Sequence, residues 1–181
     1  MMKLSDLMET DLGNILTIQD ITLDSREVGS GSLFIALPGL NLDGRDFIGQ
    51  ALDRGATAVL AESTGLKHPK TDRVIPVCGL KERLGSLANR FFDHPSNAMK
   101  IMAVTGTNGK TSITELTAQL FRLLGFSAGS IGTLGMHLNK LPTPSFNTTP
   151  DCLTLHRKLK EWRGFGVRHV AMEASSHALS Q

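Results

Sequence analysis

The 181-residue sequence predicts an α/β protein: a small mixed α/β N-terminal domain, followed by the first part of a doubly wound, parallel-sheet P-loop ATPase domain. Two observations support this fold class. Short apolar runs alternate with amphipathic segments along the chain, which is typical of strands joined by helices. In addition, the segment Thr105-Gly106-Thr107-Asn108-Gly109-Lys110-Thr111 lies between an apolar run and a helical pattern, as phosphate-binding loops do.

In the first part, glycine and proline separate short apolar segments. The expected strands are 33–37, 57–61 and 74–77, and the expected helices are 47–53 and 80–92. These elements predict a small mixed sheet with helices. Because the second helix ends before Asp93-His94-Pro95, we assign residues 1–95 to the N-terminal domain and 96–181 to the central domain, with a hinge nearer residue 79 as the alternative.

In the second part, the same alternation continues with longer helices. The expected strands are 99–104, 127–131 and 167–172, the expected helices are 110–124 and 151–162, and a glycine- and proline-rich excursion fills 132–150. Repeated strand-helix-strand units predict a parallel, right-handed, doubly wound sheet. Ligands of such sheets bind beyond the carboxyl ends of the strands, where the glycine-rich loop and Glu173 both fall.

Composition argues against several classes of protein. A net charge of +2, with 40% hydrophobic and 20% charged residues, gives no electrostatic reason to expect nucleic acid or a membrane surface as partner. No run approaches the ~18 apolar residues of a membrane span. We therefore expect a cytoplasmic monomer. Cys78 and Cys152 have neither metal-site nor disulfide spacing, so both are expected to be buried or idle thiols.

The glycine-rich loop carries the clearest chemistry. Gly106 and Gly109 allow backbone conformations that direct N–H groups at phosphate oxygens, and the helix that follows adds its positive N-terminal end. The predicted phosphate-binding residues are Gly106, Thr107, Asn108, Gly109, Lys110, Thr111 and Ser112. Lys110 would be the catalytic cation on the β/γ-phosphates, and the Thr111 hydroxyl would bind Mg²⁺.

The glycine-rich loop departs from the strict P-loop motif at one position. Val104 stands where a strict P-loop has glycine, so only the GK[ST] half of the general motif is met, and an ordinary glycine-rich turn is the alternative.

Glu173 follows an apolar strand, which predicts a carboxylate at the same sheet edge as a second Mg²⁺ ligand. A solvated loop residue is the simpler interpretation of Glu173.

The chain resembles the Mur ligase family, ATP-dependent enzymes that add amino acids to the peptidoglycan precursor. The resemblance runs from about residue 20 to the last residue and rests on TGTNGKT and five further segments: Leu23-Asp24-Ser25-Arg26, Gly31-Ser32-Leu33-Phe34-Ile35-Ala36-Leu37-Pro38-Gly39, Asp43-Gly44-Arg45, Asn147-Thr148-Thr149-Pro150 and Glu173-Ala174-Ser175-Ser176-His177. It implies ATP and Mg²⁺ as cofactors, with a glutamate at the position of Glu173 as a metal ligand. It also implies addition of the third stem-peptide residue, meso-diaminopimelate or L-lysine, to UDP-N-acetylmuramoyl-L-alanyl-D-glutamate through an acyl phosphate.

The resemblance further implies two groups of substrate contacts. Leu23 and Ser25 would hold the uridine end, under a loop formed by Leu40, Asn41 and Leu42. The residues expected on the muramoyl dipeptide are Asn147, Thr148, Thr149, Ser175 and Gln181. Helix capping by Thr148 or Thr149, and a structural ion pair between Asp24 and Arg26, are the simpler explanations of these motifs.

The family has three domains, and the resemblance leaves the C-terminal amino-acid-binding domain, a carbamylated lysine and a second metal-site histidine outside these 181 residues. We therefore expect an N-terminal fragment that is inactive as a ligase by itself and that exposes apolar strand faces and an unpaired sheet edge. Three alternatives remain: the ligase that adds the terminal dipeptide, folylpolyglutamate synthase, and a nucleotide-binding module without catalysis.

Overall fold

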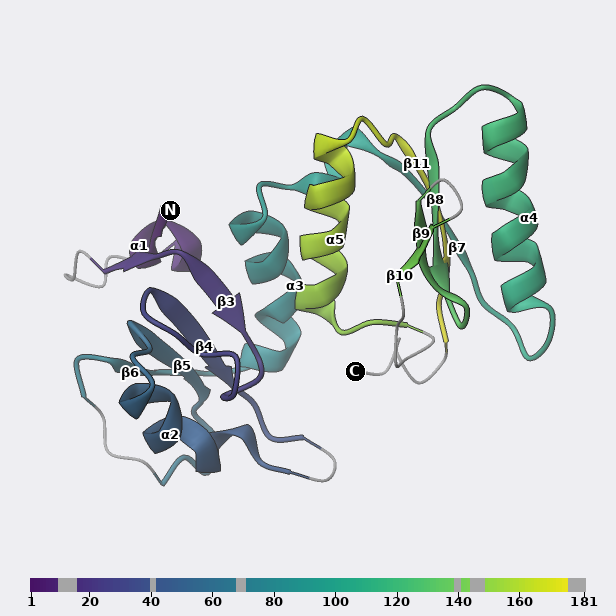
Figure 1. The fold of residues 1–181 in the computed structure, drawn as a ribbon. Helices are drawn as coiled ribbons and strands as arrows, with labels where there is room; N and C mark the ends of the chain where they lie inside the picture. The colour runs from purple at the N-terminus through teal and green to yellow at the C-terminus, as the bar shows by residue number, and fades with distance from the viewer. Residues whose placement is uncertain (10–15, 40–41, 68–70, 139–140, 144–148, 176–181) are drawn as a thin grey trace. The chain divides into compact units, whose positions relative to one another are not determined.

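The computed structural model describes residues 1–9, 16–39, 42–67, 71–138, 141–143 and 149–175 of the chain. The chain divides into two compact units, Met1–Phe91 and Phe92–Gln181, each built around a β-sheet of its own (Figure 1). The α/β fold class is thereby confirmed.

The first unit is organised around a four-stranded sheet of order β3-β4-β5-β6. Its elements in chain order are β1 (Met2–Lys3), α1 (Leu4–Met8), β2 (Thr17–Ile18), β3 (Asp20–Thr22), β4 (Ser32–Ala36), the 3₁₀ helix η1 (Gly44–Phe47), α2 (Ile48–Asp53), β5 (Ala58–Glu62), β6 (Val74–Val77) and α3 (Leu80–Phe91). All three pairings of the sheet are parallel, while β1 and β2 form a separate antiparallel pair. The expected mixed sheet is therefore wrong, because each connection returns the chain to the same end of the sheet.

Two strands of the first unit, β4 and β5, are buried along their whole length. Such burial is expected for parallel strands that are covered on both faces. Phe34 and Val59 pack on one face against Ile48 and Ala51 of α2. Helix α3 also contacts β5, and α1 contacts α3. Helix α2 thus supports β4, and a pocket opens beside the chain that follows this strand.

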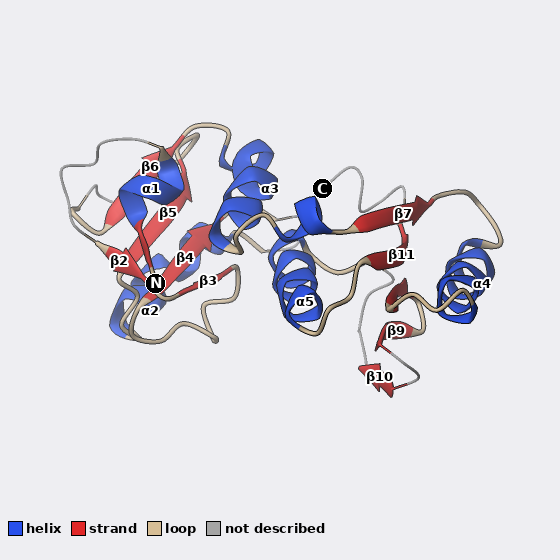
Figure 2. Ribbon diagram, turned by 90° about the horizontal axis from the view of Figure 1, so that it is seen from above, coloured by secondary structure: helices blue, strands red, loops and turns tan. Residues whose placement is uncertain are grey.

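The second unit has a five-stranded sheet of order β10-β9-β8-β11-β7. Its elements are the 3₁₀ helix η2 (Pro95–Ala98), β7 (Lys100–Val104), α4 (Lys110–Leu123), β8 (Ala128–Gly132), β9 (Gly135–Leu138), β10 (Leu141–Thr143), α5 (Cys152–Gly164) and β11 (His169–Glu173). Strand β11 lies between β7 and β8 and is parallel to both. Figures 1 and 2 show α4 and α5 on opposite faces of this sheet, as in a doubly wound fold.

The glycine- and proline-rich excursion forms two strands that the sequence patterns did not predict. Strand β9 pairs antiparallel with β8, and β10 pairs antiparallel with β9. The sheet was expected to be parallel, and these two strands depart from that expectation. The turn between β8 and β9 consists of Thr133 and Leu134, since Gly132 pairs with Gly135. Gly135 has φ 99°, which favours glycine after so tight a turn. This short hairpin places Thr133 at the carboxyl end of β8.

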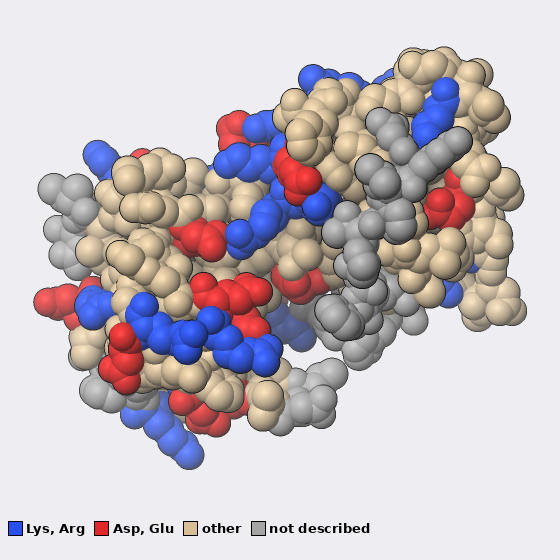
Figure 3. Space-filling view, in the orientation of Figure 1, with Lys and Arg blue, Asp and Glu red and all other residues tan. Residues whose placement is uncertain are grey.

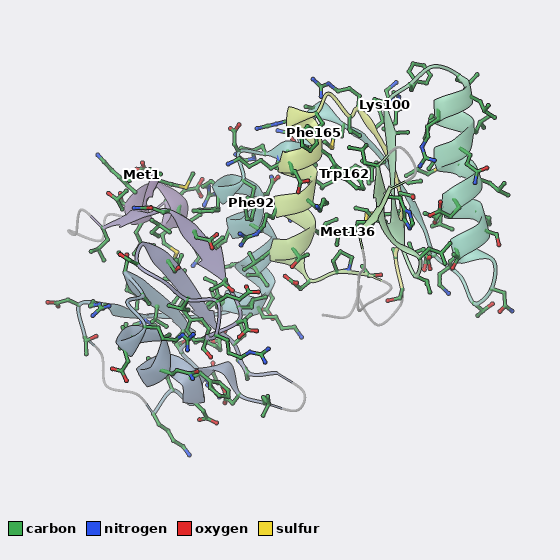
Figure 4. The ribbon with its side chains drawn as sticks, viewed as in Figure 1. Met1, Phe92, Lys100, Met136, Trp162 and Phe165 are labelled. Carbon is green, nitrogen blue, oxygen red and sulfur yellow. The ribbon has the colours of Figure 1, made fainter. Side chains whose placement is uncertain are left out.

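Helix α5 packs on its face of the sheet through a cluster of buried apolar residues. Trp162 is 2% exposed and belongs to one cluster with Met136 of β9, Leu159 and Ile131. Figure 4 shows Trp162 and Met136 between α5 and the strands. The indole lies directly over Gly129 of β8, where an added Cβ would overlap the ring. A glycine is thus required for α5 to approach the sheet this closely.

We expect Gly129→Ala to destabilise the second unit. Because the added methyl group overlaps a large buried ring, overpacking should cost about 1–3 kcal/mol, and each kcal/mol lowers the unfolding midpoint of a domain of this size by roughly 4–8 °C. Differential scanning calorimetry measures the midpoint. Gly164→Ala is the matched control, since a Cβ there meets nothing within 4 Å. Equal midpoints for the two variants would contradict the packing argument.

The opposite side of the second unit leaves large apolar side chains in solvent. Leu116 and Leu123 of α4 are exposed, the latter by 86%, and so is Met102 of β7. Strand β7 stands at the edge of the sheet among the strands that the structure describes. The expected exposure of apolar side chains on an edge strand is therefore confirmed for β7.

Candidate functional site

The glycine-rich loop connects β7 to α4 with the backbone geometry of an anion site. Gly106 has φ 145° and Gly109 has φ 78°, conformations that strongly favour glycine. Gly109 is the N-cap of the 14-residue helix α4, and no side chain caps the first turn of this helix. The first N–H groups of α4 are therefore available to an anion, and the helix dipole adds positive potential there.

The loop and the start of α4 carry several polar side chains. Lys110 Nζ donates to the carbonyl oxygens of Gly106 (2.8 Å) and Thr107 (3.4 Å), so the ammonium group lies over the loop. Asn108 and Ser112 are exposed and Thr111 is half-buried at the start of α4. An ammonium group held only by exposed carbonyl oxygens can exchange them for phosphate oxygens at small cost.

Glu173 is the last residue of β11 and is only 1% exposed. Its Oε1 accepts a hydrogen bond from the backbone N–H of Thr133 (2.8 Å), and its Oε2 accepts one from the Thr133 hydroxyl (3.2 Å). The carboxylate also lies against Gly132, where a Cβ would overlap Oε1. The interpretation of Glu173 as a solvated loop residue is therefore wrong, because the end of β11 is buried beside the β8–β9 hairpin.

The surroundings of Glu173 suit a cation. A buried carboxylate is costly unless it is paired or binds a metal, and within the described residues Glu173 makes no ion pair. In the sheet register it pairs with Val104, the residue before the glycine-rich loop. Its two oxygens and the Thr111 hydroxyl are hard donors of the kind that Mg²⁺ prefers, so these residues fit a magnesium ion completed by phosphate oxygens. No cluster of three His, Cys, Asp or Glu side chains able to hold a metal occurs in the described chain.

Two further predicted residues meet at the same edge of the sheet. The Thr149 hydroxyl donates to the carbonyl oxygen of Glu173 (3.1 Å) and accepts from the backbone N–H of Ser175 (3.3 Å). Thr149 does not cap α5, as the simpler explanation held, because Asp151 accepts hydrogen bonds from the N–H groups at the start of this helix. Asn147, Thr148, Ser176, His177 and Gln181 lie outside the described residues.

A pocket of about 550 Å³ opens in the first unit and brings Leu23, Ser25 and Leu42 together. Ser25 is buried at its wall and Leu42 is 70% exposed at its rim. Phe34, Phe47 and Gln50 line the same pocket. An apolar and aromatic lining with few polar groups is typical of sites that bind small organic ligands. Leu40 and Asn41, predicted to close this site, lie outside the described residues.

Sequence reasoning missed Phe47 and Gln50. The Ser25 hydroxyl donates to Oε1 of Gln50 (2.6 Å), so Gln50 lies directly beside a predicted ligand contact. A signal was present: positions 47 and 50 share a face of the expected helix 47–53, immediately after the Asp43-Gly44-Arg45 segment. Phe34 gave no such signal, because every residue of β4 is apolar or small and the sequence does not say which face lines a pocket.

Some charged residues of each unit form ion pairs, such as Asp24 with Arg26 in the first and Asp93 with Arg163 in the second. Arg26 Nη2 lies 2.7 Å from Asp24 Oδ2, and the hydrogen bonds from Arg26 hold the pKa of the Asp24 carboxyl below its usual value. Asp24 and Arg26 therefore form the ion pair that was the simpler explanation of this motif, although both also line the pocket. In Figure 3, blue and red side chains are interspersed on the face shown.

The cysteines and helices give no further site. Of the two expected alternatives, a buried or an idle thiol, Cys78 is not the buried one: it is exposed, because it follows the last residue of β6 in a turn. Cys152 is partly buried, and burial raises the pKa of its thiol to about 11. Both cysteines are free, as expected. None of the helices described here is long and apolar enough to cross a membrane.

Comparison with protein families gives two matches that follow one another along the chain. The Mur ligase family catalytic-domain model matches residues 17–92, and the Mur ligase middle-domain model matches residues 104–181. The second match begins at Val104, directly before the glycine-rich loop, and includes Glu173.

Two similar curated relatives carry the same name. The UDP-N-acetylmuramoyl-L-alanyl-D-glutamate--2,6-diaminopimelate ligase of Pseudomonas putida is 48% identical over 166 residues, which cover 91% of this chain and 34% of that protein. The ligase of the same name from Ectopseudomonas mendocina is 42% identical over 182 residues, covering 99% of this chain and 37% of that protein. The chain thus spans about a third of the length of the curated relatives it matches.

Two solved ligase structures match most of this chain. A UDP-N-acetylmuramoyl-L-alanyl-D-glutamate--2,6-diaminopimelate ligase matches with a TM-score of 0.78 and 33% identity, over 90% of this chain and 33% of that one. The MurF ligase from Thermotoga maritima in complex with ADP matches with a TM-score of 0.58 and 25% identity, over 92% of this chain and 33% of that one.

Proposed function

Since this chain belongs to the Mur ligase family, we propose that it is the uridine-nucleotide- and ATP-binding part of a ligase that joins 2,6-diaminopimelate to UDP-N-acetylmuramoyl-L-alanyl-D-glutamate. The names of its relatives favour diaminopimelate over L-lysine, which the sequence left open. A cytoplasmic location belongs to the same proposal, because ATP is supplied there.

In this proposal, the two units bind different parts of the substrates. The pocket beside β4 takes the uridine end of the substrate, with Leu23 and Ser25 at its wall and Leu42 at its rim. The second unit binds ATP at residues 106–112 and the dipeptide end at the edge where Thr149 and Ser175 meet. An apolar pocket with few polar groups suits a nucleoside, and a helix N-terminus suits phosphates.

The proposed reaction has two steps. A carboxylate oxygen of the D-glutamate side chain attacks the γ-phosphorus of ATP, so that an acyl phosphate forms and ADP leaves. The amine of diaminopimelate then attacks the acyl carbon, the amide bond forms, and phosphate leaves with the former carboxylate oxygen while the amine gives up a proton. The first step needs a site that holds the phosphates and the carboxylate in line and stabilises spread negative charge.

The described residues supply such a site. Lys110 moves from the loop carbonyls to the phosphates and offsets their charge, and the N–H groups at the start of α4 hold them in place. Thr111 and Glu173 would hold Mg²⁺, which when bound neutralises charge on the β- and γ-phosphates. Glu173 is kept in position by Thr133, and its backbone by Thr149.

One observation carries the proposal: Glu173, whose carboxylate is buried, pairs in the sheet register with Val104, the residue directly before the glycine-rich loop. The full-length protein should release phosphate from ATP only when UDP-muramoyl dipeptide and diaminopimelate are both present. Coupled phosphate detection, with mass spectrometry of the product, tests this. Phosphate release that depends on a folate in place of the UDP-muramoyl dipeptide, or on a dipeptide in place of diaminopimelate, would transfer the proposal to another ligase of the superfamily.

The pocket is tested separately with Ser25→Ala. Loss of this buried hydroxyl removes a polar contact and the partner of Gln50, so UDP binding should weaken by about 1 kcal/mol, roughly fivefold in Kd. Calorimetry with UDP measures the affinity. Ser86→Ala is the control, because Ser86 is exposed on α3 and its hydroxyl donates to Arg83 of the same helix. An unchanged Kd for Ser25→Ala would remove Ser25 from the proposed uridine site.

A further inference from the structure

The geometry points to Thr133 as the residue that positions the Glu173 carboxylate for a divalent cation, an inference that rests on the proposed function. Thr133 is the first residue of the β8–β9 turn and donates two hydrogen bonds to this one carboxylate. The backbone N–H holds Oε1 and the hydroxyl holds Oε2. One residue thereby fixes the plane of the carboxylate.

The chemistry of these donors matters as much as their number. Each carboxylate oxygen can accept about two hydrogen bonds or metal bonds, and Thr133 uses one on each. Both donors are neutral, so they orient the group without cancelling its charge. An Arg or Lys in the same place would compete with a metal for that charge. Thr133 therefore leaves a buried, oriented and still anionic ligand, which is what a metal site needs from its supporting residues.

The hairpin fixes Thr133 relative to Glu173. Gly132 and Gly135 close the two-residue turn, and Gly132 has no Cβ to keep the carboxylate away from the turn. Strand β11 is held on the other side by its pairing with β7, and the hydroxyl of Thr149 bonds the carbonyl oxygen of Glu173. Backbone and side chain of Glu173 are thus restrained independently. The hairpin therefore serves the site as well as the sheet.

The test separates the hydroxyl from the shape of the side chain. Thr133→Val keeps the branched shape and the backbone N–H but lacks the hydroxyl, whereas Thr133→Ser keeps the hydroxyl. Mn²⁺ binding to the full-length protein, saturated with a non-hydrolysable ATP analogue, is measured by electron paramagnetic resonance. Calorimetry with ADP in the absence of metal measures nucleotide binding alone. Loss of a supporting partner weakens metal binding by about 10–100-fold, and we expect the low end for Val because one donor remains.

The inference is supported if Thr133→Val weakens Mn²⁺ binding about tenfold, Thr133→Ser restores it, and metal-free ADP affinity stays unchanged. It is overturned if Val binds Mn²⁺ like the wild type, or if Val and Ser lose Mn²⁺ affinity equally. It is also overturned if ADP affinity without metal falls by the same factor, since that indicates a structural role. Thr133→Ala replaces Val, with the same expectations, if Val does not fold.

Glu173→Gln in the same assay distinguishes this inference from the proposed function. If Glu173→Gln leaves Mn²⁺ affinity unchanged, the metal role of Glu173 fails and the role of Thr133 fails with it. If Glu173→Gln weakens Mn²⁺ binding while Thr133→Val does not, the proposed metal site stands and only the positioning role of Thr133 is overturned.

Discussion

Lys110→Ala in the full-length protein is expected to lower the rate of ATP-dependent amide formation by a factor on the order of 10² or more. Within the described part of the loop, Lys110 is the one residue with a cationic side chain. Its ammonium group is bonded to the carbonyl oxygens of Gly106 and Thr107. Its removal leaves the backbone N–H groups in place but takes away a full positive charge from the transferring phosphoryl group. Steady-state phosphate release with both co-substrates measures the effect.

Lys100→Ala is the matched control for this variant. Lys100 is an exposed lysine at the opposite end of the same strand, so its loss changes the net charge equally without touching the loop. Lys110→Arg adds a second comparison, because it keeps the charge but changes the donor geometry. If Lys110→Ala stays within a few-fold of the Lys100→Ala rate, the loop does not act as a phosphate site.

Glu173→Gln should raise the Mg²⁺ concentration needed for activity by at least the 10–100-fold that loss of a mere supporting residue costs at metal sites. The amide keeps the size of the side chain and can still accept the hydrogen bond from the Thr133 N–H, so folding should be little affected. What disappears is the negative charge that attracts the cation. Activity measured over a range of Mg²⁺ concentrations gives the shift, and UDP binding in the other unit should not change.

Glu161→Gln serves as the control, because Glu161 is an acidic residue of the same unit whose only described ion pair is with Lys158 on the surface of α5. Surface pairs of this kind contribute about 0–1 kcal/mol, so this variant should keep the Mg²⁺ requirement of the wild type. An identical Mg²⁺ requirement for Glu173→Gln would mean that the buried carboxylate has a structural role only.

Much of the fold follows from local patterns, and the part that does not is set by pairing at a distance. The strand 74–77 and the helix beginning at Lys110 were predicted to the residue where they start, because apolar runs and glycines mark them. The β8–β9 hairpin was missed because its residues, rich in glycine, form strands only by pairing with β8. Gly132-Thr133-Leu134-Gly135 between apolar runs is a turn signal, but it does not reveal the sheet edge it joins.

The candidate site divides in the same way. The loop residues could be singled out because a strand, a glycine-rich turn and a helix in that order carry their own mechanism. Glu173 could be singled out because it follows an apolar strand, whose carboxyl end lies at the edge of the sheet where ligands bind. Thr133 could not, since it acts through a partner 40 residues away in sequence. Supporting residues of this type are defined by tertiary contact. Sequence reasoning therefore finds the groups that meet the ligand more readily than the groups that hold them.

The packing of Trp162 over Gly129 also determines how the protein can be observed. The chain has one tryptophan and no tyrosine, so its near-ultraviolet fluorescence comes almost entirely from this buried indole. Emission at short wavelength reports a closed interface between α5 and the sheet, and a red shift reports its opening to water. The signal belongs to the second unit alone. Unfolding of the first unit is optically silent in this channel, which makes the intrinsic fluorescence a selective probe of the unit that carries the phosphate loop.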